Sequence, residues 1–187
     1  MSVKQAIAFL DRDGTLVNCD VKAGMPVPTH GNIKLVDGAA EACDLLRRLG
    51  FTLVMVTNQP DIARGTIDRQ TVDETNRYIA DQLDLDITLT CRHDDLDQCA
   101  CRKPEPGLLL EASSIFRVEL DRSSVMIGDR WRDVDAGIAA GVTTILIDRG
   151  YGELLNAQPD YVAPTLVRAA EWIGTHITTR SRNDLSA

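Results

Sequence analysis

Two aspartates one residue apart, Asp11 and Asp13, follow directly after an apolar run in the segment IAFLDRDGTLV. Neighbouring carboxylates repel each other, so such a pair at the end of a buried strand calls for a bound cation or a role in chemistry. A carboxylate can attack phosphorus to form an aspartyl-phosphate, and a second one can protonate the leaving alcohol and then activate water. We therefore expect Asp11 to be a nucleophile and Asp13 a general acid and base.

Three further groups suited to phosphoryl transfer stand at or after the ends of other apolar runs: Thr57, Lys103 and Asp129. A hydroxyl and an ammonium can donate to phosphoryl oxygens, and carboxylates can hold Mg²⁺, a hard cation that prefers oxygen ligands. We expect Mg²⁺ between Asp11, the main-chain carbonyl of Asp13, and Asp129. The metal and the lysine would also explain how crowded aspartates stay ionised.

Taken one at a time, some of these residues also have non-catalytic explanations. Asp133, one helical turn after Asp129, is predicted to partner Lys103 or a metal-bound water, but it would also serve as a helix cap. A lone Thr57 would be read as a strand-end hydroxyl, and a lone lysine as a surface charge. An EF-hand is excluded because its third acidic ligand and closing Glu are absent. The combination at strand ends favours a phosphatase-like site.

The elements that must position these residues alternate along the chain. Predicted strands span 6–10, 51–58, 86–91, 124–129 and 143–148, and a short hydrophobic stretch follows at 161–163. Predicted helices span 39–50, 68–83, 106–116, 133–141 and 164–177. Strand–helix alternation with short loops predicts an α/β fold with a doubly wound parallel sheet and helices on both faces. Ligands bind such sheets at the carboxyl ends of the strands, where the candidate residues stand.

Composition limits the possible classes. With 187 residues, 44% of them apolar, the chain is about one domain long, and we expect a single domain over 1–177 and a disordered tail at 178–187. The net charge of −8 argues against a nucleic-acid partner. The apolar run 6–10 is too short for a signal peptide or a membrane span. The expected protein is a cytoplasmic monomer that does not contact membranes.

Four soft metal ligands fall within eleven residues: Cys91, His93, Cys99 and Cys101. Three thiolates and one imidazole suit a tetrahedral Zn²⁺ with no open position, which would make the site structural. An odd total of five cysteines without a secretory signal argues against a disulfide framework. The ion would tie together a loop poor in apolar side chains and would aim Arg102 and Lys103 at the site. The alternative is a pair of buried cysteines with an exposed histidine.

Four segments, FLDRDGTLV, VTNQ, CRKP and IGDRWRD, occur in this order and together resemble the haloacid dehalogenase (HAD) superfamily of aspartate-nucleophile phosphatases. The resemblance covers residues 6–148 and implies a Rossmann-like HAD fold with the catalytic set named above. The zinc loop is similar to that of the subgroup containing heptose bisphosphate 7-phosphatases and histidinol-phosphate phosphatases, which lack a separate cap domain. Specificity would then come from loops at 16–34, 59–66 and 91–103.

The segment TNQPDIARG is similar to the heptose bisphosphatase pattern, although Pro60 stands where a small residue is usual. The resemblance implies five substrate-binding residues: Asn58, Gln59, Arg64, Arg102 and Arg130. On that basis we expect a Mg²⁺-dependent phosphomonoesterase that removes the 7-phosphate of D-glycero-D-manno-heptose 1,7-bisphosphate. Histidinol phosphate or another small sugar phosphate is the alternative substrate.

Three other classes of protein share part of this pattern. A phosphoacceptor signalling domain also uses a doubly wound sheet with aspartate, threonine and lysine, but it does not need an acid such as Asp13. A DNA 3′-phosphatase has the same catalytic set but should show a basic groove, which the acidic composition disfavours. A non-catalytic zinc module would leave the acids at the strand ends unexplained.

Overall fold

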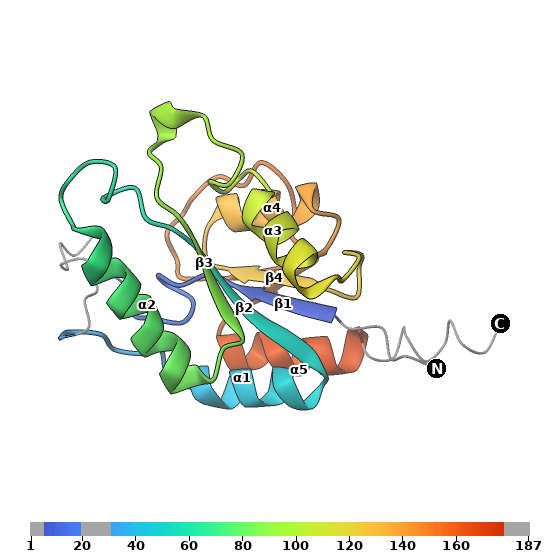
Figure 1. Cartoon of the computed structure of the whole chain (residues 1–187). Coiled ribbons are helices and arrows are strands. Elements are labelled where there is room, and N and C mark those ends of the chain that lie inside the picture. The colour runs from blue at the N-terminus through green and yellow to red at the C-terminus, as the bar shows by residue number, and fades with distance from the viewer. Residues whose placement is uncertain (1–5, 20–30, 178–187) are drawn as a thin grey trace.

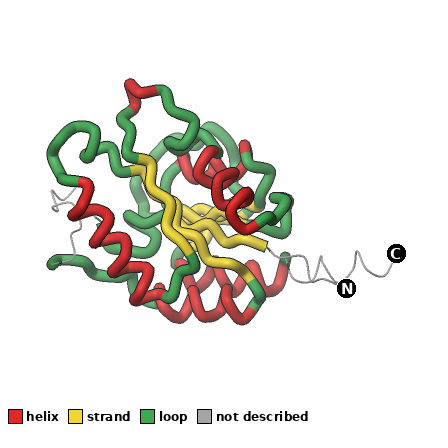
Figure 2. The backbone as a smooth tube through the Cα atoms, viewed as in Figure 1, coloured by secondary structure: helices red, strands yellow, loops and turns green. Residues whose placement is uncertain are grey.

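The computed structural model describes residues 6–19 and 31–177. Within these ranges six parallel strands form one sheet in the order β3-β2-β1-β4-β5-β6 (Figures 1 and 2). Their bounds are Ala6–Leu10 for β1, Phe51–Asn58 for β2, Ile87–Cys91 for β3, Val125–Gly128 for β4, Thr143–Ile147 for β5 and Tyr161–Ala163 for β6. The predicted parallel, doubly wound α/β fold is confirmed.

Five α-helices cover the sheet, and Figure 1 shows α1 and α5 on one face and α3 and α4 on the other. They span Ala39–Arg48 (α1), Arg69–Leu83 (α2), Gly107–Phe116 (α3), Trp131–Ala139 (α4) and Leu166–His176 (α5), and a short 3₁₀ turn, η2, spans Asp95–Asp97. Alternate residues of β1 serve the two layers. Ala8 and Leu10 join the core beneath α1 and α5, whereas Ile7 and Phe9 join the core with α3. Both faces of the central strands are therefore buried.

Helix α4 begins two residues earlier than the sequence predicts. The sequence predicts a start at Asp133, but the helix begins at Trp131. The Asp133 carboxylate accepts a hydrogen bond from the main-chain N–H of Arg130 at 3.1 Å, so it caps the helix from inside the first turn.

The order of the strands reverses between β1 and β4. From β1 the chain moves outward to β2 and β3, and from β4 it moves outward in the other direction to β5 and β6. Such a switch point opens a crevice at the carboxyl ends of the two central strands. Asp11 follows β1 and Asp129 follows β4, so both carboxylates are delivered to this crevice.

Two predictions concern residues outside the described ranges. The predicted tail at 178–187 lies there, as does most of the loop predicted at 16–34. Within the described part of the chain, the longest and most apolar helices are still too short or too polar to cross a lipid bilayer.

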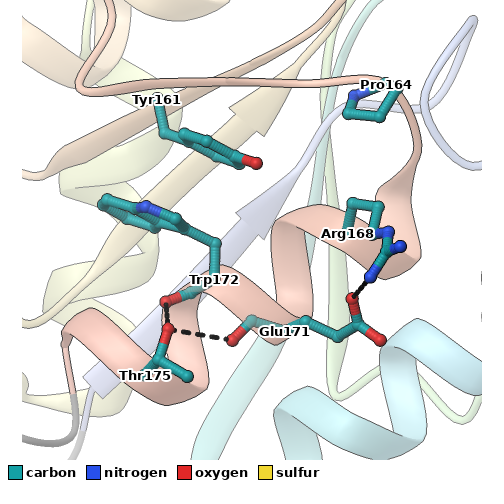
Figure 3. Close-up of a pocket in the computed structure, with 6 residues that line it drawn as sticks. All are labelled: Tyr161, Pro164, Arg168, Glu171, Trp172 and Thr175. Atoms are coloured by element: carbon teal, nitrogen blue, oxygen red, sulfur yellow. Dashed lines mark hydrogen bonds and ion pairs between the residues drawn. The ribbon is translucent and has the colours of Figure 1, made fainter.

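A shallow hollow of about 300 Å³ lies on β6 and α5 (Figure 3). The ring of Trp172 stacks between Tyr161, with centroids 4.9 Å apart, and His176, with centroids 4.5 Å apart. None of the residues predicted to do chemistry lines this hollow. The candidate site must be sought at the carboxyl ends of the strands.

Candidate active site

Three buried carboxylates converge at the switch point: Asp11, Asp129 and Asp133. Oxygen atoms from all three lie within 4.8 Å of one another. They come from the residue after β1, the residue after β4 and the first turn of α4, elements that the core fixes independently of these side chains. We call these three residues the carboxylate cluster.

Lys103 is the cation inside this cluster. Its Nζ donates to Oδ1 of Asp11 at 2.6 Å, to Oδ1 of Asp133 at 2.6 Å and to the main-chain carbonyl of Val56 at 2.9 Å. Burial by itself would lower the pKa of Lys103, but the two carboxylates more than offset burial and raise it. The lysine is therefore charged and uses all three of its N–H groups.

One lysine does not neutralise three buried carboxylates. Burial raises the pKa of Asp11 well above its ordinary value; Lys103 opposes this shift, and the neighbouring carboxylates, Asp133 first, add to it. Burial and Asp133 also raise the pKa of Asp129 to about 6, against a hydrogen bond from Tyr151. A hard divalent cation bound to these oxygens would relieve the repulsion, so the donor set fits Mg²⁺.

The main chain approaches the cluster closely at Gly14. This residue has φ +85°, and an added Cβ would lie 2.0 Å from Oδ2 of Asp129. Only glycine fits there, because any side chain would meet the carboxylate and would also strain the backbone. The next residue, Thr15, turns its hydroxyl toward Oδ1 of Asp129 at 3.5 Å. The Gly-Thr pair after the two aspartates therefore shapes the wall of the cluster.

Asp13 is not part of the carboxylate cluster, and its side chain has other partners. Its carboxylate receives hydrogen bonds from the Arg12 guanidinium and, at 2.8 Å, from Nε2 of Gln59. The same Gln59 amide donates to Oγ1 of Thr57 at 2.9 Å. The predicted acid and the predicted phosphoryl donor are thus joined through Gln59. Whether the main-chain carbonyl of Asp13 binds the metal stays a prediction.

Asn58 holds the loop that carries the lysine. Its Nδ2 donates to the carbonyl of Lys103 at 2.9 Å, and its Oδ1 accepts from the N–H of Lys103 at 3.1 Å. This reciprocal pair fixes the backbone on either side of the ammonium-bearing residue. The contact gives Asn58 a definite structural task, while its predicted contact with substrate stays a prediction.

The three arginines predicted to bind substrate each pair with an acid of this chain. Arg64 donates to Asp94 at 2.8 and 2.6 Å, and Arg102 donates to Asp95 at 2.8 Å. Arg130 pairs with Glu153 and lies over the ring of Tyr151, with its Cζ 4.7 Å from the centroid. The loops at 59–66 and 91–103 are therefore linked across the rim of the site.

The predicted zinc ligands do meet in space: Cys91, His93, Cys99 and Cys101. The Sγ of Cys99 lies 3.6 Å from that of Cys91 and 3.5 Å from that of Cys101, and Nδ1 of His93 lies 3.6 and 3.3 Å from the sulfurs of Cys91 and Cys101. A tetrahedral Zn²⁺ with bonds of about 2.0–2.3 Å requires ligand separations of roughly 3.5–3.8 Å. The four residues, here called the thiol cluster, fit such an ion.

Sequence reasoning assigned no role to Arg12 or Tyr151. Arg12 is 1% exposed and sits between the two key aspartates, but its sequence position gave no sign of its partners. Tyr151 hydrogen-bonds to Asp129, and its place shortly after β5 was an available signal, since that strand ends at the same sheet edge. Side chains in a loop beyond a strand are harder to place than side chains at the strand end itself.

Comparison with known proteins gives concordant matches. The HAD-hydrolase-like family matches residues 100–169. The D-glycero-beta-D-manno-heptose-1,7-bisphosphate 7-phosphatase of Yersinia pestis is 34% identical over 183 residues, which cover 88% of this chain and 87% of that protein. The D-glycero-D-manno-heptose-1,7-bisphosphate 7-phosphatase of Chlorobaculum tepidum is 36% identical over 184 residues, covering 87% and 91%.

A solved structure has the same fold. The D,D-heptose 1,7-bisphosphate phosphatase from B. bronchiseptica, complexed with magnesium and phosphate, superposes with a TM-score of 0.76 at 28% identity, over 91% of this chain and 98% of that one. A second heptose bisphosphate phosphatase, from Burkholderia thailandensis, superposes with a TM-score of 0.60 at 23% identity, over 91% of this chain and 99% of that one, and supports the fold alone.

Proposed function

The chain belongs to the family of HAD-like heptose-1,7-bisphosphate 7-phosphatases, and on that premise we propose that it removes the 7-phosphate of D-glycero-D-manno-heptose 1,7-bisphosphate. The observation that carries the proposal is Lys103 bridging Asp11 and Asp133 beside Asp129, at the sheet edge where parallel strands bind ligands. We also propose that residues 1–177 act as one catalytic domain.

Asp11 is the proposed nucleophile. One of its carboxylate oxygens bonds to phosphorus as the bond to the sugar oxygen breaks, and Asp13 gives a proton to that leaving oxygen. In the second half, Asp13 takes a proton from water, the water oxygen bonds to phosphorus, and the bond from Asp11 to phosphorus breaks. Thr57 donates to the phosphoryl oxygens, and Lys103 does so by exchanging one of its three present acceptors for a phosphoryl oxygen.

Mg²⁺ would be held by the carboxylates of Asp11 and Asp129, with the main-chain carbonyl of Asp13 as the further protein ligand. When bound, it supplies positive charge to the phosphoryl oxygens and offsets the crowding of the acids. Asp133 contributes by orienting the lysine ammonium, which it contacts at 2.6 Å.

Zn²⁺ is the proposed structural ion of the thiol cluster, at one per chain. Three thiolates and one imidazole leave no coordination position for substrate. Two residues after Cys101 the chain reaches Lys103, so the ion would fix the loop from which the catalytic ammonium extends. Arg64, Arg102 and Arg130 are proposed to exchange their present acid partners for the far end of the substrate, together with Asn58 and Gln59.

A phosphate-release panel tests the function. Purified protein with Mg²⁺ is offered both anomers of the heptose bisphosphate, histidinol phosphate, fructose bisphosphate and a 3′-phosphorylated oligonucleotide at equal concentrations. We expect the highest kcat/KM for a heptose bisphosphate, with the 1-phosphate retained in the product. A preference for histidinol phosphate would replace the substrate assignment, and a stable phosphoprotein without turnover would refute the phosphatase.

A further inference from the structure

Arg12 is a buried cation that takes no part in the proposed reaction steps. It lies between Asp11 and Asp13 in sequence, and it is the largest of the side chains with almost no exposed surface, at 1%. A guanidinium out of water is costly unless its N–H groups find partners, and a buried ion pair usually adds little net stability over an apolar replacement. A stability role alone explains this residue poorly.

One end of Arg12 grips the Asp13 carboxylate. Nε donates to both oxygens, each at 3.1 Å, and Nη2 donates to Oδ2 at 2.8 Å. Two-point pairing of this kind fixes the plane of a carboxylate as well as its position. The Asp13 side chain is 27% exposed, so without Arg12 only the Gln59 amide would hold its carboxylate against other rotamers.

The other end of Arg12 is tied to the scaffold. Nη1 donates to Oδ1 of Asn76 at 3.0 Å, and Nδ2 of Asn76 donates in turn to Oγ1 of Thr90 at 3.0 Å. Asn76 lies in α2 and is 2% exposed, and Thr90 lies in β3. A chain of hydrogen bonds thus runs from the outermost strand of the sheet through α2 to the carboxylate of Asp13.

We propose that Arg12 is the positioning residue of the reaction, and that with Asn76 it holds Asp13 where that carboxyl exchanges protons with the leaving oxygen and with water. The inference rests on the proposed phosphatase function. Arg12 touches neither phosphorus nor the leaving group, and its effect passes entirely through Asp13. Proton transfer tolerates little misplacement of the acid, because donor and acceptor must come within hydrogen-bond reach.

The leaving group distinguishes positioning from general structural damage. An alkyl phosphate releases a poor leaving group that needs the Asp13 proton, whereas p-nitrophenyl phosphate releases a stable phenolate that does not. For Arg12→Gln we expect kcat/KM to fall roughly 100-fold with the alkyl phosphate and to stay near wild type with p-nitrophenyl phosphate. Hydrolysis of the phosphoenzyme still needs Asp13, so p-nitrophenolate should appear as a burst followed by a slow steady state.

Four further variants complete the test. Asp13→Asn should reproduce the same selectivity and burst, and the Arg12→Gln/Asp13→Asn double variant should lose no more than Asp13→Asn alone, since both changes disable one proton transfer. Asn76→Ala should give a weaker form of the pattern, roughly tenfold with the alkyl phosphate. Arg77→Gln makes the same charge change at an exposed position of α2 and should match wild type.

The outcomes separate the two proposals. If Arg12→Gln lowers kcat/KM equally with both substrates, or if the double variant loses the product of the single losses in kcat/KM, the positioning role is overturned. If Arg12→Gln does not fold, Asn76→Ala decides by the same criterion. If the wild-type protein releases no phosphate from either substrate, the phosphatase proposal fails first and the role of Arg12 fails with it.

Discussion

Within the described residues, potential metal-binding groups gather in two places, and the two are built in different ways. The carboxylate cluster is assembled from the ends of two central strands and the start of a helix, and all three acids are buried. The thiol cluster begins with Cys91, the last residue of β3, and its other three residues lie in the loop that follows. Of the four, only Cys91 is buried. The first is shaped by the core of the domain, the second mainly by its own ligands.

The two constructions indicate different roles for the two proposed ions. Without a cation in the carboxylate cluster we expect the acids to stay in place, because Lys103 pairs with Asp11 and Asp133 and the end of β4 positions Asp129. The loop that carries the thiol cluster has little other support, because Leu96 at its tip is 92% exposed and does not join the core. We therefore expect the first ion to govern chemistry and the second to govern the order of the loop that leads to Lys103.

The largest expected effect comes from the nucleophile. Asp11→Asn should lower kcat by roughly 10⁴-fold or more, because an amide cannot form the aspartyl-phosphate. Thermal denaturation should show a folded protein, and zinc content should be unchanged. Phosphate release measures the loss, and Asp44→Asn, an exposed acid of α1, serves as the control. Undiminished turnover by Asp11→Asn would end the covalent mechanism.

Breaking the thiol cluster should have a smaller effect on rate and a larger one on structure. Cys99→Ser should bring zinc from one ion per chain to well below one and lower kcat/KM roughly 10–100-fold, because the loop no longer fixes Lys103. Limited proteolysis should cut between residues 92 and 100. Cys19→Ser changes a thiol outside the cluster and should retain zinc and activity. Wild-type protein purified without zinc would contradict the assignment.

Two glycines allow each cluster to be perturbed by one methyl group. Gly14→Ala places a Cβ 2.0 Å from Oδ2 of Asp129, and Gly107→Ala places one 2.2 Å from the carbonyl of Ala100. Each should cost about 2 kcal/mol of stability. Magnesium titration of activity should weaken only in Gly14→Ala, and zinc affinity should weaken only in Gly107→Ala. Gly31→Ala, with open space around it, is the control; equal effects of both changes on both metals would erase the distinction.

The smallest effect is a pH dependence confined to the carboxylate cluster. Burial raises the pKa of Asp129 to about 6 from its ordinary 3.8, so the folded, magnesium-free protein binds more protons than the unfolded chain between about pH 4 and 6. Its free energy of unfolding should therefore fall as pH rises through that window, by on the order of 1–2 kcal/mol, and the raised pKa of Asp11 acts in the same direction.

Urea denaturation at several pH values, with zinc present, measures this slope. Saturating Mg²⁺ should flatten it by favouring the ionised acids, and Asp129→Asn should flatten it without Mg²⁺. Acids with a lowered pKa, such as Asp94, whose pKa the Arg64 hydrogen bond lowers to about 2, change the free energy of unfolding at lower pH. They therefore do not mask the slope expected from Asp129. A stability that rises across this window would contradict the predicted repulsion.

The sequence predicted the residues at the strand ends, because the end of an apolar run such as 51–58 indicates where a strand ends. The carboxyl ends of parallel strands then lie at the same edge of the sheet. Sequence patterns could not predict partners that meet only through the fold. The link from Arg12 to Asn76 spans 64 positions, and no local rule joins them. The predicted start of α4 at Asp133 was wrong for a related reason, since the Asp133 carboxylate accepts a hydrogen bond from the N–H of Arg130 and lies inside the first turn.

The ring stack on α5 has a practical consequence. The chain has two tryptophans. Trp172 stacks with Tyr161 and His176. Trp131 is the first residue of α4 and directly follows Asp129 and Arg130 of the site. A Trp131→Phe protein would fluoresce only from the far side of the sheet, and a Trp172→Phe protein only from the reaction rim. Ligand arrival and loss of the overall fold can thus be recorded as two separate optical signals.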